Sequence, residues 1–292
     1  MSQKSLFKKI IPVLSAALAV SFAVVNYRDM HRFVKRECFI KTKKLPKDKK
    51  AKFILLADLH SWEYGHGNAS LLKAIRREAP DFIVVAGDIM TARPEHDNRP
   101  AVDFIRSLTK EYRVYYGLGN HEQRSGLYPE TYGNMYREYF HAIRSKNLIV
   151  LNNESITFDD FEILGLTIDR SYYKRLVKQH MSASYIVQTI GLPEKDKFSI
   201  LIAHNPEYGD TYFQYPADLF VSGHLHGGIV RLPFLGGVAS PSLKLFPKYD
   251  GGYYRKGNRH GYVSCGLGTH TVPMRFNNPG EFTVFTICGE GK

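Results

Sequence analysis

Five short polar blocks occur in this chain, and each begins where an apolar, β-branched run ends. The blocks are residues 58–60 (DLH), 87–88 (GD), 119–122 (GNHE), 203–205 (AHN) and 223–226 (GHLH). The runs before them are residues 53–56, 82–85, 114–116, 199–202 and 218–221, and their composition predicts β-strands. In an α/β sheet, ligands bind beyond the carboxyl ends of the strands, so we expect the five blocks to converge on one pocket.

The blocks contain the residue types that hold divalent metal ions. The candidate ligands are Asp58, His60, Asp88, Asn120, His204, His224 and His226. Two ions that lie close together need a bridging carboxylate, and Asp88 is the natural bridge because Gly87 lets the backbone come near without a side-chain clash. Asp58, His60 and His226 would then complete one site. Asn120, His204 and His224 would complete the other.

The mixture of imidazole and oxygen ligands predicts which metals the sites take. Manganese, iron and zinc accept such a mixture, whereas magnesium and calcium prefer oxygen alone. The sequence does not choose among the first three, and manganese is our working prediction. A water or hydroxide shared by two such ions is a nucleophile near neutral pH, and the ions also hold the oxygens of an attacked phosphate.

These blocks resemble the pattern of the calcineurin-like metallophosphoesterases, which is D-x-H, G-D, G-N-H-[DE], H and G-H-x-H in this order. The resemblance continues through residues 227–228, 231–233, 246–249 and 266–268, which look like the membrane-associated bacterial YkuE/YaeI-like branch, and covers about residues 45 to 287. That branch usually has glutamine after the double glycine. Here Ile229 stands in its place, which removes a polar substrate contact at this position.

The expected fold is α/β, a four-layer sandwich of two stacked mixed β-sheets flanked by helices. Helical patterns alternate with the strand-like runs after residue 52, and the second half of the chain is rich in strand-like runs and glycine. The predicted helices are residues 68–79, 100–110, 129–146 and 176–191. Further strands are predicted at residues 262–264 and 282–285.

The resemblance also implies a catalytic residue. In the family, the histidine that corresponds to His121 does not hold metal but lies over the substrate, which makes His121 the candidate general acid. Histidine titrates near neutrality, and general acid catalysis contributes about 100- to 10,000-fold in rate. Glu122 would orient this imidazole or be a solvated carboxylate at a helix start. Arg231 and Arg124 are candidate contacts for a substrate phosphate, with solvated surface arginines as the alternative.

The net charge of +12 belongs to the N-terminal arm. Residues 1–52 contain 14 Lys or Arg against 3 Asp or Glu, which leaves 26 against 25 for the rest of the chain. A nearly neutral domain does not favour nucleic acid as a partner. The cysteines Cys38, Cys265 and Cys288 are too few for a disulfide framework. The sequence carries no signal for an oligomeric state.

The N-terminal arm also contains an uncharged, mainly apolar run at residues 10–25. We predict a single membrane anchor or signal-like segment at residues 1–27, a basic juxtamembrane linker that binds an anionic membrane surface at 28–50, and the metallophosphoesterase domain at 51–288. A cleaved signal peptide is the alternative, because residues 17–19 (ALA) resemble a cleavage site. The flanking lysines and arginines favour a cytoplasmic domain, whereas signal-like segments in the resembling branch often lead outside.

The predicted function is hydrolysis of a phosphodiester or pyrophosphate by attack of a metal-bridging hydroxide, on a membrane-proximal or lipid-linked substrate. The apolar residues in 232–235 and 243–246 would hold an acyl or prenyl chain or else pack in the core. A phosphomonoesterase or phosphoprotein phosphatase would use the same metals. A non-catalytic phosphate-binding module is the alternative from a different class.

Overall fold

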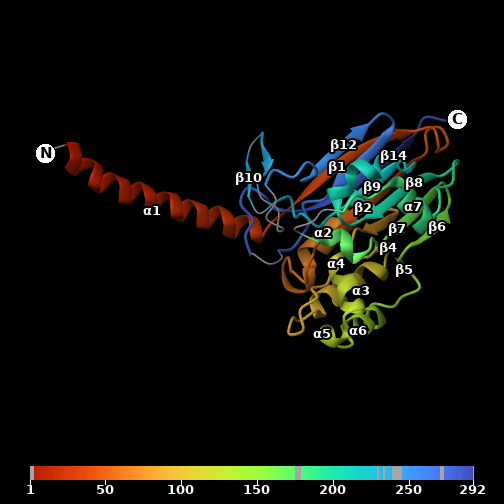
Figure 1. Cartoon of the computed structure of the whole chain (residues 1–292), viewed down its shortest axis with the longest axis horizontal. Helices are drawn as coiled ribbons and strands as arrows, with labels where there is room; N and C mark the ends of the chain where they lie inside the picture. Colours follow the sequence, from red (N-terminus) through yellow and green to blue (C-terminus); the bar gives the residue numbers. More distant parts are fainter. Residues whose placement is uncertain are drawn as a thin grey trace.

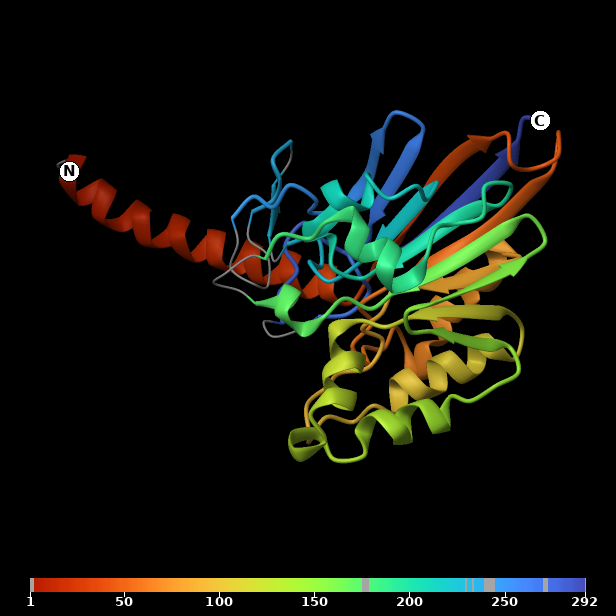
Figure 2. The same cartoon turned by 45° about the vertical axis from the view of Figure 1, so that its right-hand side comes forward.

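Two six-stranded sheets stack face to face, and helices cover their outer faces (Figure 1, Figure 2). The computed structural model describes residues 3–291 except 175–178, 229, 233, 239–244 and 270–272. Both the α/β class and the sandwich of two mixed sheets predicted from the sequence are confirmed.

The first sheet is mixed, and its centre is parallel. Strands β2 to β5 run parallel, β14 pairs antiparallel with β2, and β1 pairs parallel with β14 at the edge. In spatial order the strands are β1 (Phe33–Thr42), β14 (Gly280–Gly289), β2 (Lys50–Leu56), β3 (Phe82–Val85), β4 (Arg113–Gly117) and β5 (Leu148–Leu151).

The second sheet has a parallel centre between two antiparallel edges. In spatial order its strands are β12 (Gly252–Lys256), β13 (Arg259–Val263), β9 (Leu219–Ser222), β8 (Phe198–Ala203), β7 (Phe161–Leu166) and β6 (Glu154–Phe158). A separate two-stranded hairpin consists of β10 (Arg231–Leu232) and β11 (Gly236–Gly237).

The described residues form eight α-helices, of which α1 projects away from the sheets and the others lie on the outer faces. They are α1 (Gln3–Met30), α2 (Ala69–Glu78), α3 (Arg99–Thr109), α4 (Asn120–Leu127), α5 (Pro129–Tyr132), α6 (Met135–Ala142), α7 (Ala183–Ile190) and α8 (Gly209–Tyr212), with short 3₁₀ turns η1 (His66–Asn68), η2 (Arg170–Tyr173) and η3 (Pro206–Tyr208). The prediction at 129–146 was too long, because Gly133 takes a positive φ of 58° between α5 and α6. The prediction at 176–191 is shortened to α7, and its first residues lie outside the described part.

The space between the two sheets is filled by aromatic and aliphatic side chains. Phe53 stacks on Phe285 at 4.7 Å and on Phe82 at 5.2 Å between ring centroids, and none of these rings is more than 3% exposed. Burial of each ring contributes about 1.5–3 kcal/mol. Strands β2 to β4 are buried on both faces, which explains why they appear in the sequence as continuous apolar runs. This core fixes the ends of the strands that carry the polar blocks.

Part of the predicted linker at 28–50 is a strand instead. Strand β1 pairs with β14 over its whole length, with Cys38 and Ile40 buried against the core. The lysines and arginines of β1 are exposed, and charges on an edge strand protect it from pairing with another molecule. Because this stretch contains so many charged residues, the sequence suggested a linker and not a strand. Strand β1 belongs to the folded domain.

Helix α1 projects away from the sheets (Figure 1). It is longer than the apolar run at 10–25 that predicted it, because the helix continues to Met30. Within it, Pro12–Met30 is long and apolar enough to cross a membrane. A signal sequence can have the same length and apolar composition.

The role of β1 leads to a prediction about where the domain begins. A chain that starts at residue 45 lacks β1 and exposes the edge of β14, so we expect it to unfold at a lower temperature and to aggregate. A chain that starts at Ser21 keeps β1 and should match the full-length domain. Thermal unfolding and size-exclusion chromatography of the two chains test this. Identical melting temperatures and monomeric elution of both would contradict a structural role for β1.

Candidate metal centre

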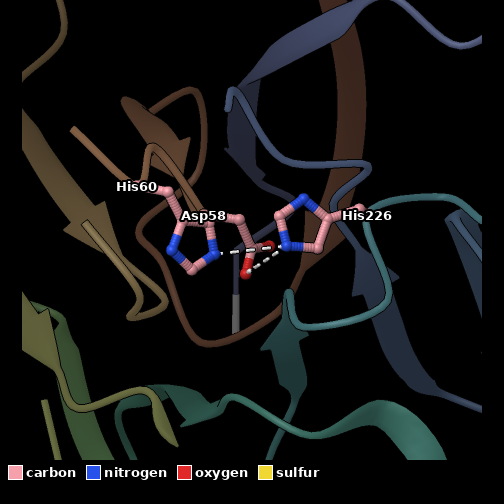
Figure 3. A group of neighbouring side chains, drawn as sticks. All are labelled: Asp58, His60 and His226. Carbon is pink, nitrogen blue, oxygen red and sulfur yellow. Dashed lines mark hydrogen bonds and ion pairs between the residues drawn. The ribbon is translucent and has the colours of Figure 1, made fainter. Parts of the chain in front are cut away.

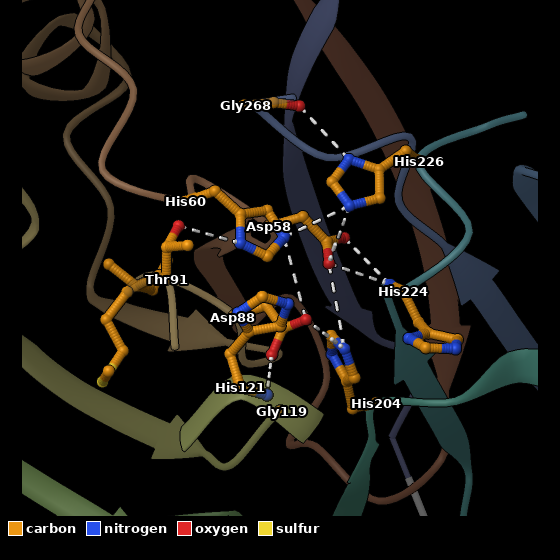
Figure 4. A network of polar contacts seen from close by, with 12 residues as sticks. Asp58, His60, Asp88, Thr91, Gly119, His121, His204, His224, His226 and Gly268 are labelled. Atoms are coloured by element: carbon orange, nitrogen blue, oxygen red, sulfur yellow. Dashed lines mark hydrogen bonds and ion pairs between the residues drawn. The ribbon is translucent and has the colours of Figure 1, made fainter. Parts of the chain in front are cut away.

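The five polar blocks meet at one edge of the two sheets. They follow β2, β3 and β4 of the first sheet and β8 and β9 of the second, at the carboxyl end of each strand. Figure 4 shows their side chains gathered around Asp58 and Asp88. The convergence that the sequence predicted is therefore present in the structure.

Several of these residues have a strained backbone. A positive φ occurs at Asp58 (52°), His60 (50°), Asp88 (54°), His224 (70°) and His226 (51°). Left-handed conformations of residues other than glycine cost about 1–3 kcal/mol each and cluster where function requires them. The turns after β2, β3 and β9 thus accept strain in order to direct carboxylate and imidazole groups into one space.

Two glycines allow the loops after β3 and β4 to touch. A Cβ atom on Gly87, whose φ is +89°, would lie 2.3 Å from the backbone nitrogen of Gly119. A Cβ atom on Gly119 would lie 2.2 Å from Oδ1 of Asp88. The sequence analysis explained Gly87 by a close approach of the backbone to the metals, and the structure adds the close approach of the loop after β4.

One group of possible metal ligands consists of Asp58, His60 and His226 (Figure 3). All three are buried, and their ligand atoms lie within 4.8 Å of one another. The Nε2 atoms of His60 and His226 are 3.2 Å apart, and Nε2 of His226 is 3.8 Å from Oδ1 of Asp58. This is the trio that the sequence assigned to one ion.

A second group contains Asp88, His204 and His224, and a third contains His60, Asp88 and His121. Asp88 thus lies in two of the groups, and Nε2 of His204 is 3.1 Å from its Oδ2 atom. This central place is what a carboxylate between two ions requires. The third group differs from the sequence assignment because it adds His121 as a neighbour of the cluster.

The imidazoles of His204 and His226 have the hydrogen-bond partners that metal ligands need. Nδ1 of His204 donates to the carbonyl oxygen of Ala86 at 2.6 Å, and Nδ1 of His226 donates to that of Gly268 at 3.2 Å. Because a carbonyl oxygen only accepts, the proton of each neutral ring is on Nδ1. The Nε2 lone pair of each ring then points into the cluster, which is the usual arrangement of a metal-binding imidazole.

The amide of Asn120 supports the same conclusion. Among the described residues, its buried Oδ1 atom has no hydrogen-bond partner. An unsatisfied buried acceptor costs about 1–3 kcal/mol, and a cation beside it removes this cost. The donor set of this cluster, with carboxylate, amide and imidazole atoms, therefore fits divalent metal ions.

The charges in the cluster are strongly coupled. Burial raises the pKa of Asp58 to about 7, against the opposing effect of His204. Burial alone would also raise the pKa of Asp88, but the imidazoles of His204 and His121 outweigh it and hold the pKa well below its ordinary value. Burial lowers the pKa of His204, yet Asp88 and Asp58 raise it to about 10. Two buried carboxylates thus require positive charge nearby, which protons or metal ions supply.

His121, the predicted general acid, lies beside this cluster. Its backbone N–H donates to Oδ1 of Asp88 at 2.7 Å, and its ring packs edge-on against His60 at 4.6 Å between centroids. Its Nδ1 atom accepts from the backbone N–H of Ala92 at 2.8 Å. Because that N–H only donates, the ring proton of the neutral imidazole is on Nε2.

The two predicted phosphate contacts have different surroundings. Nη2 of Arg124 lies 3.0 Å and 3.1 Å from the two ring nitrogens of His121, so the structure brings this guanidinium to the site. Arg231 donates to the carbonyl oxygen of Gly227 at 2.8 Å and pairs with Asp250 at 3.1 Å. Its contacts are thus with Gly227, next to His226, and with Asp250, which precedes β12. Ile229, where the branch usually has glutamine, lies outside the described residues.

Glu122 is neither solvated nor directed at His121. It is completely buried and accepts hydrogen bonds from the backbone N–H groups of Asp88 at 2.9 Å, Ile89 at 3.0 Å and Gly119 at 3.0 Å, and from the Tyr116 hydroxyl at 2.7 Å. Burial, with Asp88 nearby, raises the pKa of Glu122 to about 7. Its structural role is therefore to hold the Asp88 turn.

Asn278 is a neighbour of the site that sequence reasoning missed. Its Nδ2 atom donates to the carbonyl oxygens of His226 at 2.6 Å and Gly228 at 2.7 Å. Asn278 is far from the polar blocks in sequence and follows no strand-like run, so no local pattern could have indicated it.

Comparison with known proteins agrees with this geometry. The model of the family described as calcineurin-like phosphoesterase matches residues 51–228. The chain belongs to this family. It is accordingly a metal-dependent phosphoric ester hydrolase.

Curated relatives extend the likeness to most of the chain. The metallophosphoesterase YkuE of Bacillus subtilis is 26% identical over 98% of this chain and 98% of its own length. The phosphodiesterase YaeI of Escherichia coli is 32% identical over 81% of this chain and 82% of its own. The UDP-2,3-diacylglucosamine pyrophosphatase LpxG of Chlamydia muridarum is 24% identical over 76% and 79%.

The contacts of Glu122 lead to a prediction. A Glu122→Gln change places an amide N–H₂ group among several N–H donors, so we expect a loss of about 1–3 kcal/mol in the free energy of unfolding and weaker retention of metal. The exposed Glu130→Gln in α5 is the matched control. Chemical denaturation and metal analysis of both variants measure the effect. If Glu122→Gln behaved like the control, Glu122 would not hold the Asp88 turn.

Proposed function

We propose that this hydrolase uses two divalent ions, with Asp88 between them, to cleave a phosphodiester or pyrophosphate on a membrane-proximal or lipid-linked substrate. The ligands would be Asp58, His60, Asp88, Asn120, His204, His224 and His226. The observation that supports this best is the buried cluster in which Asp88 belongs to two groups of possible ligands at once. Among manganese, iron and zinc, manganese is the metal we favour.

The ions would supply a nucleophile from water near neutral pH and would polarise the phosphoryl oxygens. The chain itself would supply the proton. His121 holds its ring proton on Nε2, because Nδ1 accepts from Ala92, and it would pass this proton to the leaving oxygen. Arg124, beside that ring, would bind a phosphoryl oxygen through its planar guanidinium.

Two other functions remain as alternatives. A phosphomonoesterase or phosphoprotein phosphatase would use the same ions, and the names of the relatives, phosphodiesterase and pyrophosphatase, favour the proposed reaction class over it. Paired assays with monoester and diester substrates separate the two. A non-catalytic phosphate-binding module is disfavoured because each predicted ligand position carries a residue that can bind metal, and because His121 lies beside the cluster.

The membrane part of the proposal is supported by exposed apolar residues near α1. Phe234 and Leu235, at the tip of the β10–β11 hairpin, are exposed, as are Leu245 and Phe246. The hairpin projects on the side of the domain from which α1 emerges (Figure 1, Figure 2). These residues belong to the two segments that the sequence suggested for an acyl or prenyl chain, 232–235 and 243–246, of which residues 233, 243 and 244 lie outside the described part. We propose a cell-membrane location with α1 as the single anchor, and the flanking charges favour the cytoplasmic side.

The metal arrangement makes distinct predictions for two ligands. Asp88→Asn should weaken the binding of both ions at once, because one carboxylate oxygen of the bridge is lost. His226→Ala should weaken the binding of mainly one ion. Elemental analysis of the purified proteins after dialysis measures the number of ions per chain. Two ions and normal activity in Asp88→Asn would contradict the bridging role.

The role of His121 is tested by the leaving group. His121→Ala should retain the metals but lose about 100- to 10,000-fold in rate on an alkyl ester, whose leaving oxygen needs a proton. The loss should be much smaller for a nitrophenyl ester, whose leaving group departs without one. Equal losses on both substrates would exclude the general-acid role, and loss of metal would make His121 a ligand.

The membrane proposal is tested with anionic vesicles that carry a lipid phosphodiester. Deletion of residues 1–20 and the double change Phe234→Ser with Leu235→Ser should each slow hydrolysis in vesicles, by about tenfold or more for the double change. Neither should affect a soluble chromogenic diester. Leu192→Ser, an exposed leucine that precedes β8 at the opposite end of the sheet, is the control. If both variants hydrolysed the vesicle substrate at the wild-type rate, the membrane proposal would be wrong, and the protein would be a phosphodiesterase with a soluble substrate.

A further inference from the structure

The last turns of α1 are bound to the segment that precedes β14. Oδ1 of Asn26 accepts a hydrogen bond from the backbone N–H of Arg275 at 2.8 Å. Oδ2 of Asp29 accepts one from the backbone N–H of Asn278 at 3.0 Å. Residues three or four apart share one face of a helix, so this face of α1 satisfies two backbone donors of the segment at 275–278.

The same two residues of that segment hold His226. Asn278 donates through Nδ2 to the carbonyl oxygens of His226 and Gly228, at 2.6 Å and 2.7 Å. Arg275 donates through Nη2 to the carbonyl oxygen of Gly268 at 2.5 Å. That oxygen also accepts from Nδ1 of His226 (Figure 4). His226 is therefore held at its backbone by one residue and at its ring through the other.

The burial of these groups argues against an incidental contact. The Asp29 side chain is 0% exposed, although it lies in the last turn of α1, where the helix dipole disfavours negative charge. Arg32 compensates this charge at 2.9 Å. Arg275 is only 1% exposed. A helix that served only as an anchor would need no buried carboxylate at its end.

An apolar contact lies on the same face of the helix. The ring of Phe22 stacks on that of Phe276, with centroids 4.8 Å apart and planes 15° apart. Phe22, Asn26 and Asp29 follow the spacing of one helical stripe. The docked part of α1 therefore begins near Phe22, and residues 12–21 before it are exposed.

We propose that Asn278 and Arg275 are positioning residues for His226, and that Asn26 and Asp29 of α1 hold them in place. The end of the helix then supports the metal centre, in addition to the anchoring role proposed above. This inference rests on the ligand role of His226 proposed above. It also means that a chain cut after Met30 binds metal less tightly, even where no membrane is involved.

The test uses the full-length protein and compares two pairs of changes. Asn26→Ala with Asp29→Ala removes both acceptors, whereas Asn26→Asp with Asp29→Asn keeps an acceptor at each position and the same net charge. Mn²⁺ affinity is measured by competition with a chelator, and the visible spectrum of the Co²⁺-loaded protein reports the ligand geometry. We expect the alanine pair to lose about 10- to 100-fold in affinity for one ion, with a changed spectrum. The acceptor-preserving pair should restore both.

A double-mutant cycle separates positioning from general stability. Asn278→Ala should weaken Mn²⁺ binding in the wild-type background but add nothing in a His226→Ala background. Equal losses in both backgrounds, or an alanine pair with wild-type affinity and spectrum, would overturn the positioning role. The single change Asn26→Ala, at a half-buried residue, gives the same comparison should the double variant fold poorly. If His226→Ala itself left the affinity unchanged, the ligand assignment would fail instead.

Discussion

The structure around the site depends on the burial of two carboxylates, Asp58 and Asp88, in one space. Each is almost completely removed from solvent, and a buried charge is stable only when opposite charge or hydrogen bonds surround it. The imidazoles of His60, His204 and His226 surround this space, and together with the carboxylates they form groups that could hold a divalent metal ion. The positive φ angles of the turns and the close contact of the glycine loops serve this arrangement.

The two-sheet fold supplies what such a cluster requires. Strands β2 to β4 and β8 to β9 end at the same edge, so each turn contributes ligands without a long loop. Buried supports behind the ligands keep the turns in place. Glu122 accepts from four backbone N–H groups around Asp88, and Asn278 donates to two carbonyl oxygens around His226. These hydrogen bonds orient the turns that carry Asp88 and His226.

Helix α1 joins the N-terminal arm to this centre. Through Asn26 and Asp29 it meets the segment that carries Arg275 and Asn278, while β1 continues the chain into the first sheet. The helix and the catalytic domain are therefore connected by hydrogen bonds as well as by the chain. This connection places the end of the helix close to the His226 turn.

The sequence by itself determined the strands that precede the polar blocks and the candidate ligands, because each is a local pattern of an apolar run followed by a polar turn. The α/β sandwich followed from the alternation of helical and strand patterns along the chain. The gathering of the ligands into one cluster was predictable from the rule for strand ends. Only the tertiary structure decided the strand β1, the support of Glu122 and the contacts of Asn278. Charges masked the alternation of the first, and the other two depend on partners that the fold, not the neighbouring sequence, brings within reach.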